Sequence, residues 1–204
     1  MTGHLIAVEG GEGSGKSTQA RRLAERLGGR AILTFEPGDS PLGAEVRRLV
    51  LDSPDLDITD RAEALLMAAD RAQHVVQVIG PALAAGKAVI TDRFAGSSIA
   101  YQGHGRQLSA EAVEHLSRWA TDGLWPDLTI LLEVSPRQAE ARLERPKDRM
   151  ESAGDAFHAR VHDGFLVQAM ADPDRWAVVD GTRSPDEVAA AIWDVISIRF
   201  PDLT

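Results

Sequence analysis

The stretch Glu9-Gly10-Gly11-Glu12-Gly13-Ser14-Gly15-Lys16-Ser17-Thr18 predicts the fold of this chain. It contains the pattern G-x-x-x-x-G-K-[S/T] of a phosphate-binding loop, which joins a buried strand to a helix. The apolar run 5–8 precedes it, and residues 19–27, with apolar side chains at helical spacing, follow it. A Gly-rich turn before an ordinary helix is the alternative, and the flanking strand and helix argue against it. We therefore expect this loop to bind the phosphates of a nucleotide.

The residue types of the loop suit a polyphosphate. Glycines let the backbone curl so that its N–H groups point inward, and the following helix adds unpaired N–H groups and the positive end of its dipole. Lys16 supplies a mobile charge for the β- and γ-phosphates, and the Ser17 hydroxyl is a ligand for Mg²⁺. The residues expected to contact the nucleotide here are Gly10, Gly11, Glu12, Gly13, Ser14, Gly15, Lys16, Ser17 and Thr18. The motif alone does not separate a kinase from an ATPase, a GTPase or a switch.

Composition narrows the class of protein further. The chain has 204 residues, of which 44% are hydrophobic, enough for one domain with a sizeable core. It has no cysteine, which excludes disulfides and thiolate metal sites. The net charge of −9 argues against nucleic-acid binding, and no apolar run approaches membrane-spanning length. Residues 1–4 lead into a strand without a signal peptide, so we expect a cytoplasmic protein with neither nucleic acid nor membrane as a partner.

Apolar runs alternate with helical patterns along the whole chain. Short continuous apolar runs are typical of strands buried on both faces of a sheet. Such runs lie at 5–8, 31–35, 88–91, 128–134 and 176–179, with helical patterns such as 59–85 and 110–120 between them. This alternation predicts an α/β fold with a five-stranded parallel sheet and helices on both faces. Ligands of such sheets bind beyond the carboxyl ends of the strands.

Charged residues follow the second and third expected strands. Glu36 stands before a Pro-Gly turn at the ligand edge of the sheet, where a solvated turn carboxylate is the alternative interpretation. Asp92 ends the third strand, where an acid of a phosphate-loop protein often helps to hold Mg²⁺. Arg93 beside it can clamp a phosphate with two N–H groups, or form a structural pair with Asp92.

These motifs stand in a recognisable order. The phosphate loop is followed by Glu36-Pro37-Gly38, Asp92-Arg93-Phe94, Ser98-x-x-Tyr101-Gln102-Gly103, Pro126-Asp127-Leu128 and Asp148-Arg149-Met150-Glu151. In this order they resemble the bacterial thymidylate kinase family over nearly the whole chain. The segment 92–103 is the discriminating part, since most phosphate-loop proteins lack it. The resemblance implies a three-layer P-loop NTPase fold, in which a single kinase domain, 1–204, carries a lid at about 142–154.

The resemblance also implies how the nucleotides are held. Lys16 and the loop backbone would hold the phosphates of ATP, and Ser17 and Asp92 would serve Mg²⁺. Arg93 would bridge the acceptor phosphate and the phosphoryl group in transit, so Lys16 and Arg93 are expected to be catalytic. The residues expected around dTMP are Glu12, Glu36, Arg47, Met67, Arg71, Arg93, Ser98, Tyr101 and Gln102. In the family, Ser98 and Gln102 fall where thymine is hydrogen-bonded, and Tyr101 lies against the deoxyribose.

The lid is expected to supply positive charge to the transferred phosphoryl group. Some members of the family carry an Arg inside the phosphate loop, at the position that is Gly13 here. Bacterial members supply it from the lid instead. Arg142, Arg145 and Arg149 are spaced i, i+3, i+7, so a helix would place them on one face, and a solvated basic face is the alternative. We expect Arg145 and Arg149 to be catalytic and Arg142 to bind ATP.

Three positions depart from the family pattern, and a fourth has two interpretations. Phe35 replaces the usual Arg before Glu-Pro-Gly, and Asp39 replaces a Gly. Met67 replaces the ring stacked on thymine, and it either packs on the base or belongs to the helical core. Arg183 falls in the loop that the resemblance expects to contact adenine. The same loop is also typical of a helix start, with Ser184 as the N-cap and Pro185 at the first helical position.

The sequence thus predicts Mg²⁺·ATP-dependent transfer of a phosphoryl group to dTMP, with Mg²⁺ as cofactor. A kinase for another nucleoside or nucleotide is the first alternative, favoured by Met67 and Phe35. A nucleotide-dependent switch ATPase is the second, but a switch has no need for an acceptor site or a basic lid. The family resemblance also implies a homodimer.

Overall fold

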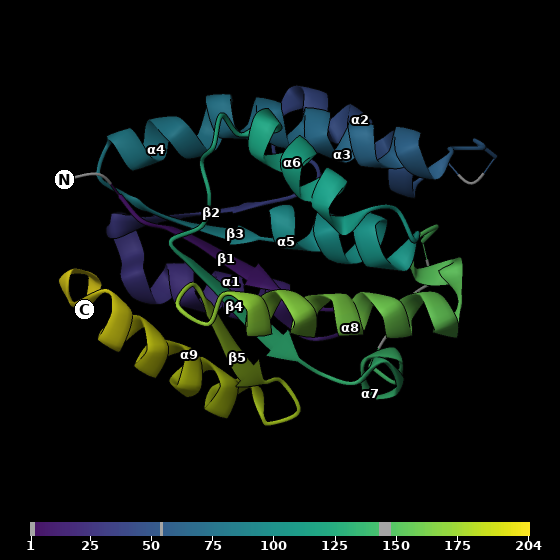
Figure 1. The fold of residues 1–204 in the computed structure, drawn as a ribbon. Helices are drawn as coiled ribbons and strands as arrows, with labels where there is room; N and C mark the ends of the chain where they lie inside the picture. Colours follow the sequence, from purple (N-terminus) through teal and green to yellow (C-terminus); the bar gives the residue numbers. More distant parts are fainter. Residues whose placement is uncertain (1–2, 54, 143–147) are drawn as a thin grey trace.

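Five parallel strands form one sheet in the computed structural model, which describes residues 3–53, 55–142 and 148–204 (Figure 1). The strands are β1 (Leu5–Glu9), β2 (Ala31–Phe35), β3 (Ala88–Asp92), β4 (Leu128–Glu133) and β5 (Trp176–Asp180). Their order in the sheet is β2-β3-β1-β4-β5, and every pair of neighbours is parallel. The expected parallel sheet is therefore confirmed, with each strand within one residue of its expected bounds.

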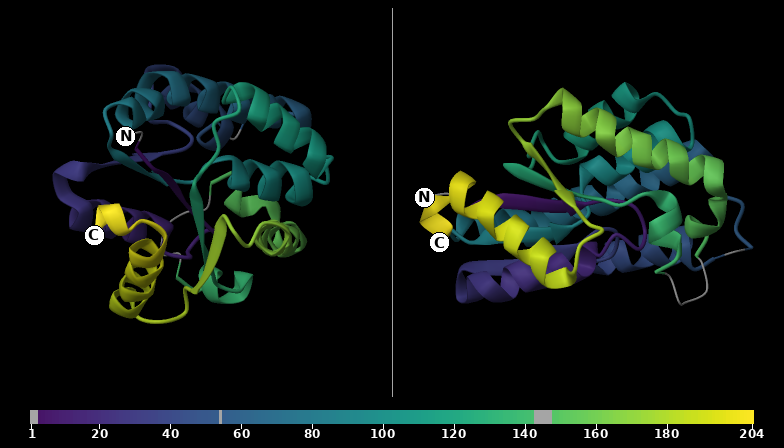
Figure 2. Two further views of the ribbon diagram at one scale, coloured as in Figure 1. Left: turned by 60° about the vertical axis from the view of Figure 1, so that its left-hand side comes forward. Right: turned by 90° about the horizontal axis from the view of Figure 1, so that it is seen from below.

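Helices cover both faces of this sheet, as expected (Figure 2). They are α1 (Lys16–Leu27), α2 (Pro41–Leu51), α3 (Asp60–His74), α4 (Gly80–Ala84), α5 (Ala95–Ser98), α6 (Ala110–Ala120), α7 (Pro136–Glu140), α8 (Asp155–Ala171) and α9 (Pro185–Arg199). Short 3₁₀ segments lie at Gly28–Arg30, Glu151–Ala153 and Pro201–Leu203, and π-helical segments at Val75–Ile79 and Ile99–Gly105. The helix expected over 59–85 is interrupted by the first π-helical segment. In the described part of the chain, no helix has the length and apolar character needed to cross a membrane.

The core consists of two layers because strand side chains alternate between the faces. On one face Ile6 and Val8 of β1 pack with α1 and α9. On the other face Leu5 and Ala7 pack with Val75 and its neighbours, while Leu131 of β4 packs with α8. Because the strands are buried on both faces of the sheet, they appear in the sequence as continuous apolar runs.

The strand order brings the predicted motifs to one edge of the sheet. Asp92 at the end of β3 pairs in register with Val8 of the central strand β1 and with Phe35 of β2. The phosphate loop after β1, the Glu36 turn after β2 and the segment after β3 therefore start side by side. This edge carries the candidate site.

Candidate active site

The phosphate loop leaves the start of α1 open to an anion. Gly15 precedes the helix with φ 95° and provides no side-chain cap, so the first N–H groups of α1 face the loop. Lys16 is buried, and its Nζ donates to the carbonyl oxygen of Gly11 over 2.8 Å. Burial lowers the pKa of Lys16, and the positive charge of Arg93 adds to this effect. A polyphosphate in the loop would give this ammonium group its counter-charge.

Gly13 has no room for a side chain. Its φ is 72°, and a Cβ atom at this position would lie 2.2 Å from the backbone oxygen of Ala139, next to the end of α7. A side chain at this position of the loop would therefore collide with the backbone of α7.

Ser17 and Asp92 meet beyond the ends of β1 and β3. The Ser17 hydroxyl donates to Asp92 Oδ2 over 2.5 Å, and Asp92 Oδ1 is buried without a hydrogen-bond partner among the described residues. Hydroxyl and carboxylate oxygens are the ligands that Mg²⁺ takes, so this pair fits the predicted ion. In residues 3–53, 55–142 and 148–204, no cluster of three or more His, Cys, Asp or Glu could hold a metal. An ion here would depend on phosphate oxygens as well, which is usual for Mg²⁺.

Arg93 is held in an uncommon backbone conformation, with φ 74°. Buried Glu9 fixes the segment around it: Glu9 Oε1 accepts from the Phe94 and Ser97 N–H groups over 2.9 and 3.0 Å. The Arg93 guanidinium donates to Glu12 Oε1 and, over 2.9 Å, to Ser97 Oγ. Burial by itself would lower the pKa of Arg93, but the carboxylate of Glu12 and the other acids nearby outweigh it and raise the pKa. Arg93 is therefore a permanent cation in contact with Gly10 and Glu12 of the phosphate loop.

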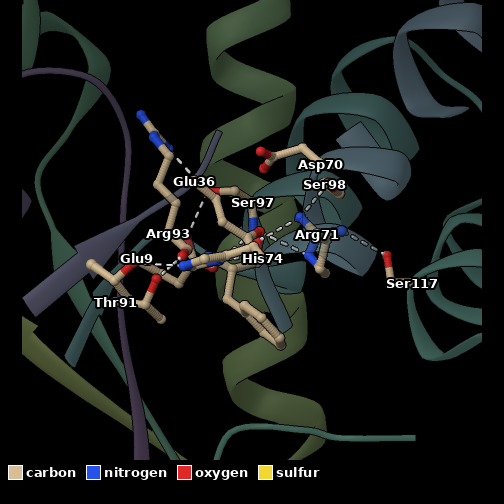
Figure 3. A network of polar contacts seen from close by, with 12 residues as sticks. Glu9, Glu36, Asp70, Arg71, His74, Thr91, Arg93, Ser97, Ser98 and Ser117 are labelled. Atoms are coloured by element: carbon tan, nitrogen blue, oxygen red, sulfur yellow. Dashed lines mark hydrogen bonds and ion pairs between the residues drawn. The ribbon is translucent and has the colours of Figure 1, made fainter. Parts of the chain in front are cut away.

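Arg71 of α3 forms the second cationic centre. Its Nε donates to Glu36 Oε2 over 2.9 Å, and both side chains are only 3% exposed. Its terminal nitrogens donate to Ser98 Oγ over 3.0 Å, to the Phe94 carbonyl oxygen over 3.3 Å and to Ser117 Oγ over 3.2 Å (Figure 3). Glu36 is therefore part of a buried ion pair, and the interpretation as a solvated turn carboxylate is wrong.

A chain of polar contacts continues from Glu36 through residues that sequence reasoning missed. His74 Nδ1 lies 2.9 Å from Glu36 Oε1, and His74 Nε2 lies 2.5 Å from Thr34 Oγ1. Thr34 in turn donates to Asp39 Oδ2 over 2.5 Å, so the Asp that replaces a family Gly braces the Glu36 turn. The spacing of Arg71 and His74, three residues apart on one helix face, was the available signal.

Asp70 of α3 supports the same turn. Its Oδ1 accepts from the Gly38 N–H over 3.1 Å, while its Oδ2 is buried with no partner in the described part of the chain. Burial, and then the charge of Glu36, raises the pKa of Asp70 from 3.8 to about 6. The turn is thus held by a carboxyl group that is costly to ionise.

A single cavity of about 570 Å³ joins these features. Its walls include twelve of the predicted residues: Glu12, Lys16, Ser17, Glu36, Arg47, Met67, Arg71, Asp92, Arg93, Ser98, Tyr101 and Gln102. Met67 lines this space and belongs to none of the core clusters. Phe35 also lines it, with the Arg47 guanidinium 5.9 Å from the centre of its ring. Arg21, which the sequence did not suggest, and Asp148 and Met150, to which it assigned no role, also line the wall.

The described lid arginines, Arg142 and Arg149, do not line this cavity. Arg149 donates Nε to the Val50 carbonyl oxygen over 2.8 Å and Nη2 to Glu63 Oε2. Arg142 follows the end of α7 and donates to the Gly181 carbonyl oxygen over 3.0 Å. Arg142 and Arg149 both lie outside helices, so the expected helix with three arginines on one face is wrong at these two positions. The prediction for Arg145 lies outside the described residues.

Asp148 explains why the sequence around Arg149 forms a turn. Its Oδ1 accepts from the Met150 and Glu151 N–H groups over 2.8 and 2.9 Å. Such side-chain bonds to the following backbone compete with a continuing helix.

Arg183 lies in the loop after β5, outside the cavity, and its Nε donates to Asp180 Oδ2 over 3.1 Å. Ser184 begins α9 as its N-cap: its hydroxyl accepts from the Glu187 N–H over 3.4 Å, and Glu187 Oε2 accepts from the Ser184 N–H over 3.0 Å. The expected helix start at Ser184 and Pro185 is therefore confirmed.

Comparisons with known proteins agree with this geometry. The family model described as thymidylate kinase matches residues 8–192. A thymidylate kinase of Bifidobacterium longum is 48% identical over 94% of this chain and 96% of that protein, and one of Leifsonia xyli is 51% identical over 93% and 92%. The crystal structure of thymidylate kinase from Ehrlichia chaffeensis superposes with a TM-score of 0.78 at 32% identity, over 97% of this chain and 99% of the other. The chain belongs to the thymidylate kinase family.

Proposed function

We propose that this chain transfers the γ-phosphoryl group of ATP to dTMP, giving dTDP and ADP. The observation that carries the proposal is the shared cavity, whose wall contains Lys16 and Ser17 of the phosphate loop together with Arg71 and Gln102. A donor phosphate site that opens directly into a polar acceptor site brings two substrates in line, which is most of what phosphoryl transfer requires.

The donor phosphates would be held by the phosphate-loop backbone, the start of α1 and Lys16. The Lys16 ammonium, now donating to the Gly11 carbonyl, would turn to the β- and γ-phosphates. We assign Ser17 and Asp92 to Mg²⁺, which when bound would neutralise charge on the phosphate oxygens. The unpartnered Asp92 Oδ1 supports this assignment.

The acceptor would enter from the side of α3 and the Glu36 turn. Arg93 stands between Glu12 of the phosphate loop and Tyr101, and a cation there can contact both the acceptor phosphate and the group in transit. Ser98 and Gln102 supply hydrogen-bonding groups for a pyrimidine, and Met67 an apolar surface for its ring. Glu36 and Arg47 complete the wall near the phosphate and sugar.

Arg145 is our proposed source of lid charge on the transferred phosphoryl group. The exclusion of a side chain at Gly13 supports a source outside the phosphate loop. We keep Arg149 as a second candidate, and we propose that Arg142 and Arg183 serve the ATP side, where the loops after α7 and β5 meet.

We also propose a homodimer. Leu65 of α3, Val76 after it and Trp119 of α6 are 58%, 72% and 82% exposed on neighbouring helices. Large apolar side chains grouped on one surface mark an interaction site, and a second copy is the commonest partner. The proposed location is the cytoplasm, where ATP and nucleoside monophosphates occur together.

The test of the proposed function is product formation with Mg²⁺·ATP and dTMP, dUMP, dCMP or dGMP as acceptor. We expect the highest kcat/KM with dTMP. A kinase for another nucleotide would prefer another acceptor, and a switch ATPase would hydrolyse ATP without forming any diphosphate product from the acceptor.

A further inference from the structure

We propose that Glu63 is a positioning residue that makes Gln102 present a hydrogen-bond acceptor to the base of the acceptor nucleotide. It thereby selects a base with an N3–H group, thymine or uracil, over cytosine. The inference deepens the proposed function and rests on it, because it concerns the same acceptor site. Glu63 itself does not line the cavity, and it belongs to none of the motifs that resemble the family.

Glu63 is a fully buried carboxylate in the first turn of α3, with 0% exposure. Its two oxygens together accept four hydrogen bonds. Oε1 accepts from Gln102 Nε2 over 2.9 Å and from Arg106 Nε over 3.3 Å. Oε2 accepts from Arg106 Nη2 over 3.1 Å and from Arg149 Nη2. The carboxylate is therefore saturated by three side chains from two distant segments of the chain, 102–106 and the turn at 149.

Two guanidinium groups donate to both carboxyl oxygens of Glu63. Arg106 and Arg149 both face it, and their side chains are mostly buried, at 18% and 20% exposure. A guanidinium group carries only N–H donors, so each Glu63 oxygen acts toward it as an acceptor. An ionised carboxylate has no hydrogen to donate, so it can only accept.

This fixes the orientation of the Gln102 amide. The two ends of a Gln amide have opposite hydrogen-bonding roles, and its neighbours decide which end faces which way. Because Glu63 accepts, Nε2 must face it, and the carbonyl oxygen Oε1 turns away. Within residues 3–53, 55–142 and 148–204 no group donates to Oε1, while Gln102 lines the acceptor cavity.

The base then meets an acceptor and not a donor. Thymine and uracil carry a hydrogen on N3 and can donate it to Gln102 Oε1, whereas N3 of cytosine is itself an acceptor. Two facing acceptors leave both groups unsatisfied, which an enclosed site penalises strongly. Replacing Glu63 by Gln removes the constraint, since a neutral amide can accept from Gln102 or donate to it. Gln102 can then turn and offer its N–H to cytosine.

The test compares kcat/KM for dTMP, dUMP and dCMP in the wild type and in Glu63→Gln. We expect the dTMP-to-dCMP ratio to fall about tenfold or more, the size expected for one mispaired buried hydrogen bond. The dTMP-to-dUMP ratio should stay unchanged, because both bases carry N3–H. Glu114→Gln is the matched control, since Glu114 pairs with Arg118 on the surface of α6, and it should move neither ratio.

Two further variants keep the test decisive. If Glu63→Gln is unstable, the charge-balanced Glu63→Gln, Arg106→Gln should show the same fall in the ratio. In a Gln102→Ala background, Glu63→Gln should change the ratio no further. A wild type that prefers dTMP, combined with equal losses for all three substrates in Glu63→Gln, would overturn this inference alone. A wild type that phosphorylates none of them would overturn the proposed function and the inference with it.

Discussion

The buried carboxyl group of Asp70 lowers the stability of the folded protein when it is ionised. Burial, and next the charge of Glu36, raises its pKa from 3.8 to about 6. Between these two pH values the folded chain binds more protons than the unfolded chain, so the free energy of unfolding falls as the pH rises through this window. The difference between the two pKa values corresponds to about 3 kcal/mol once the group is fully ionised.

Asp70→Asn should therefore stabilise the protein in a pH-dependent way. The Asn carbonyl can still accept from the Gly38 N–H, but it has no charge to desolvate. Integrating over the titration, the stability of Asp70→Asn relative to wild type should rise by about 2 kcal/mol between pH 4.5 and pH 8. The measurement is urea denaturation of both proteins at the two pH values.

The comparison across pH isolates the charge from other effects of the substitution. A weaker hydrogen bond to Gly38 would lower the free energy of unfolding of Asp70→Asn equally at both pH values. It therefore cancels in the comparison. Asp163→Asn on the exposed surface of α8 is the control, and its stability relative to wild type should not change with pH in this way. An equal difference between Asp70→Asn and wild type at pH 4.5 and pH 8 would refute the reasoning, because Asp70 would then titrate alike in the folded and unfolded chain.

Five other substitutions test the phosphate loop, the lid and the dimer. Lys16→Ala should keep its circular dichroism spectrum and lose most turnover, and an unchanged kcat with ATP would contradict the phosphate-loop assignment. Gly13→Ala should lower stability by about 1–3 kcal/mol in calorimetry, because its Cβ would lie 2.2 Å from the Ala139 oxygen at a positive φ. Arg145→Ala should lower kcat about a hundredfold or more with little change in the dTMP KM. Arg149→Ala should do the same if Arg149 reaches the phosphoryl group, but it should mainly raise the dTMP KM if its role is the contact with Glu63. Trp119→Glu should sediment as a monomer where the wild type sediments as a dimer, and unchanged sedimentation would exclude this surface as the interface.

Much of the fold and of the cavity wall could be predicted from the sequence. Strands buried on both faces leave continuous apolar runs, and a parallel sheet brings the residues after each strand to one edge. Glu36 and Asp92 could therefore be assigned to one site from their position after strands alone. The phosphate loop needs no distant partner to form, so its local pattern was sufficient.

The contacts that sequence reasoning missed join segments far apart in the chain. Glu63 accepts from Gln102 of the segment after β3 and from Arg149 of the lid, and no local pattern links these positions. The expected lid helix is wrong at Arg149 for a different reason. Its arginines have helical spacing, but Asp148 bonds the following N–H groups, and this local competition is stronger than the periodicity.

The hydrogen bonds of the Arg71 guanidinium support our proposal that Gln102 carries much of the base selection. A guanidinium has five N–H groups. Four donate within the protein, to Glu36, Ser98, Ser117 and the Phe94 carbonyl, as counted among the described residues. At most one remains for a nucleotide, so Arg71 cannot form a two-pronged contact with it. Under our proposal, discrimination between bases comes from a neighbour whose orientation is fixed, and the Gln102 amide, held by Glu63, meets that requirement.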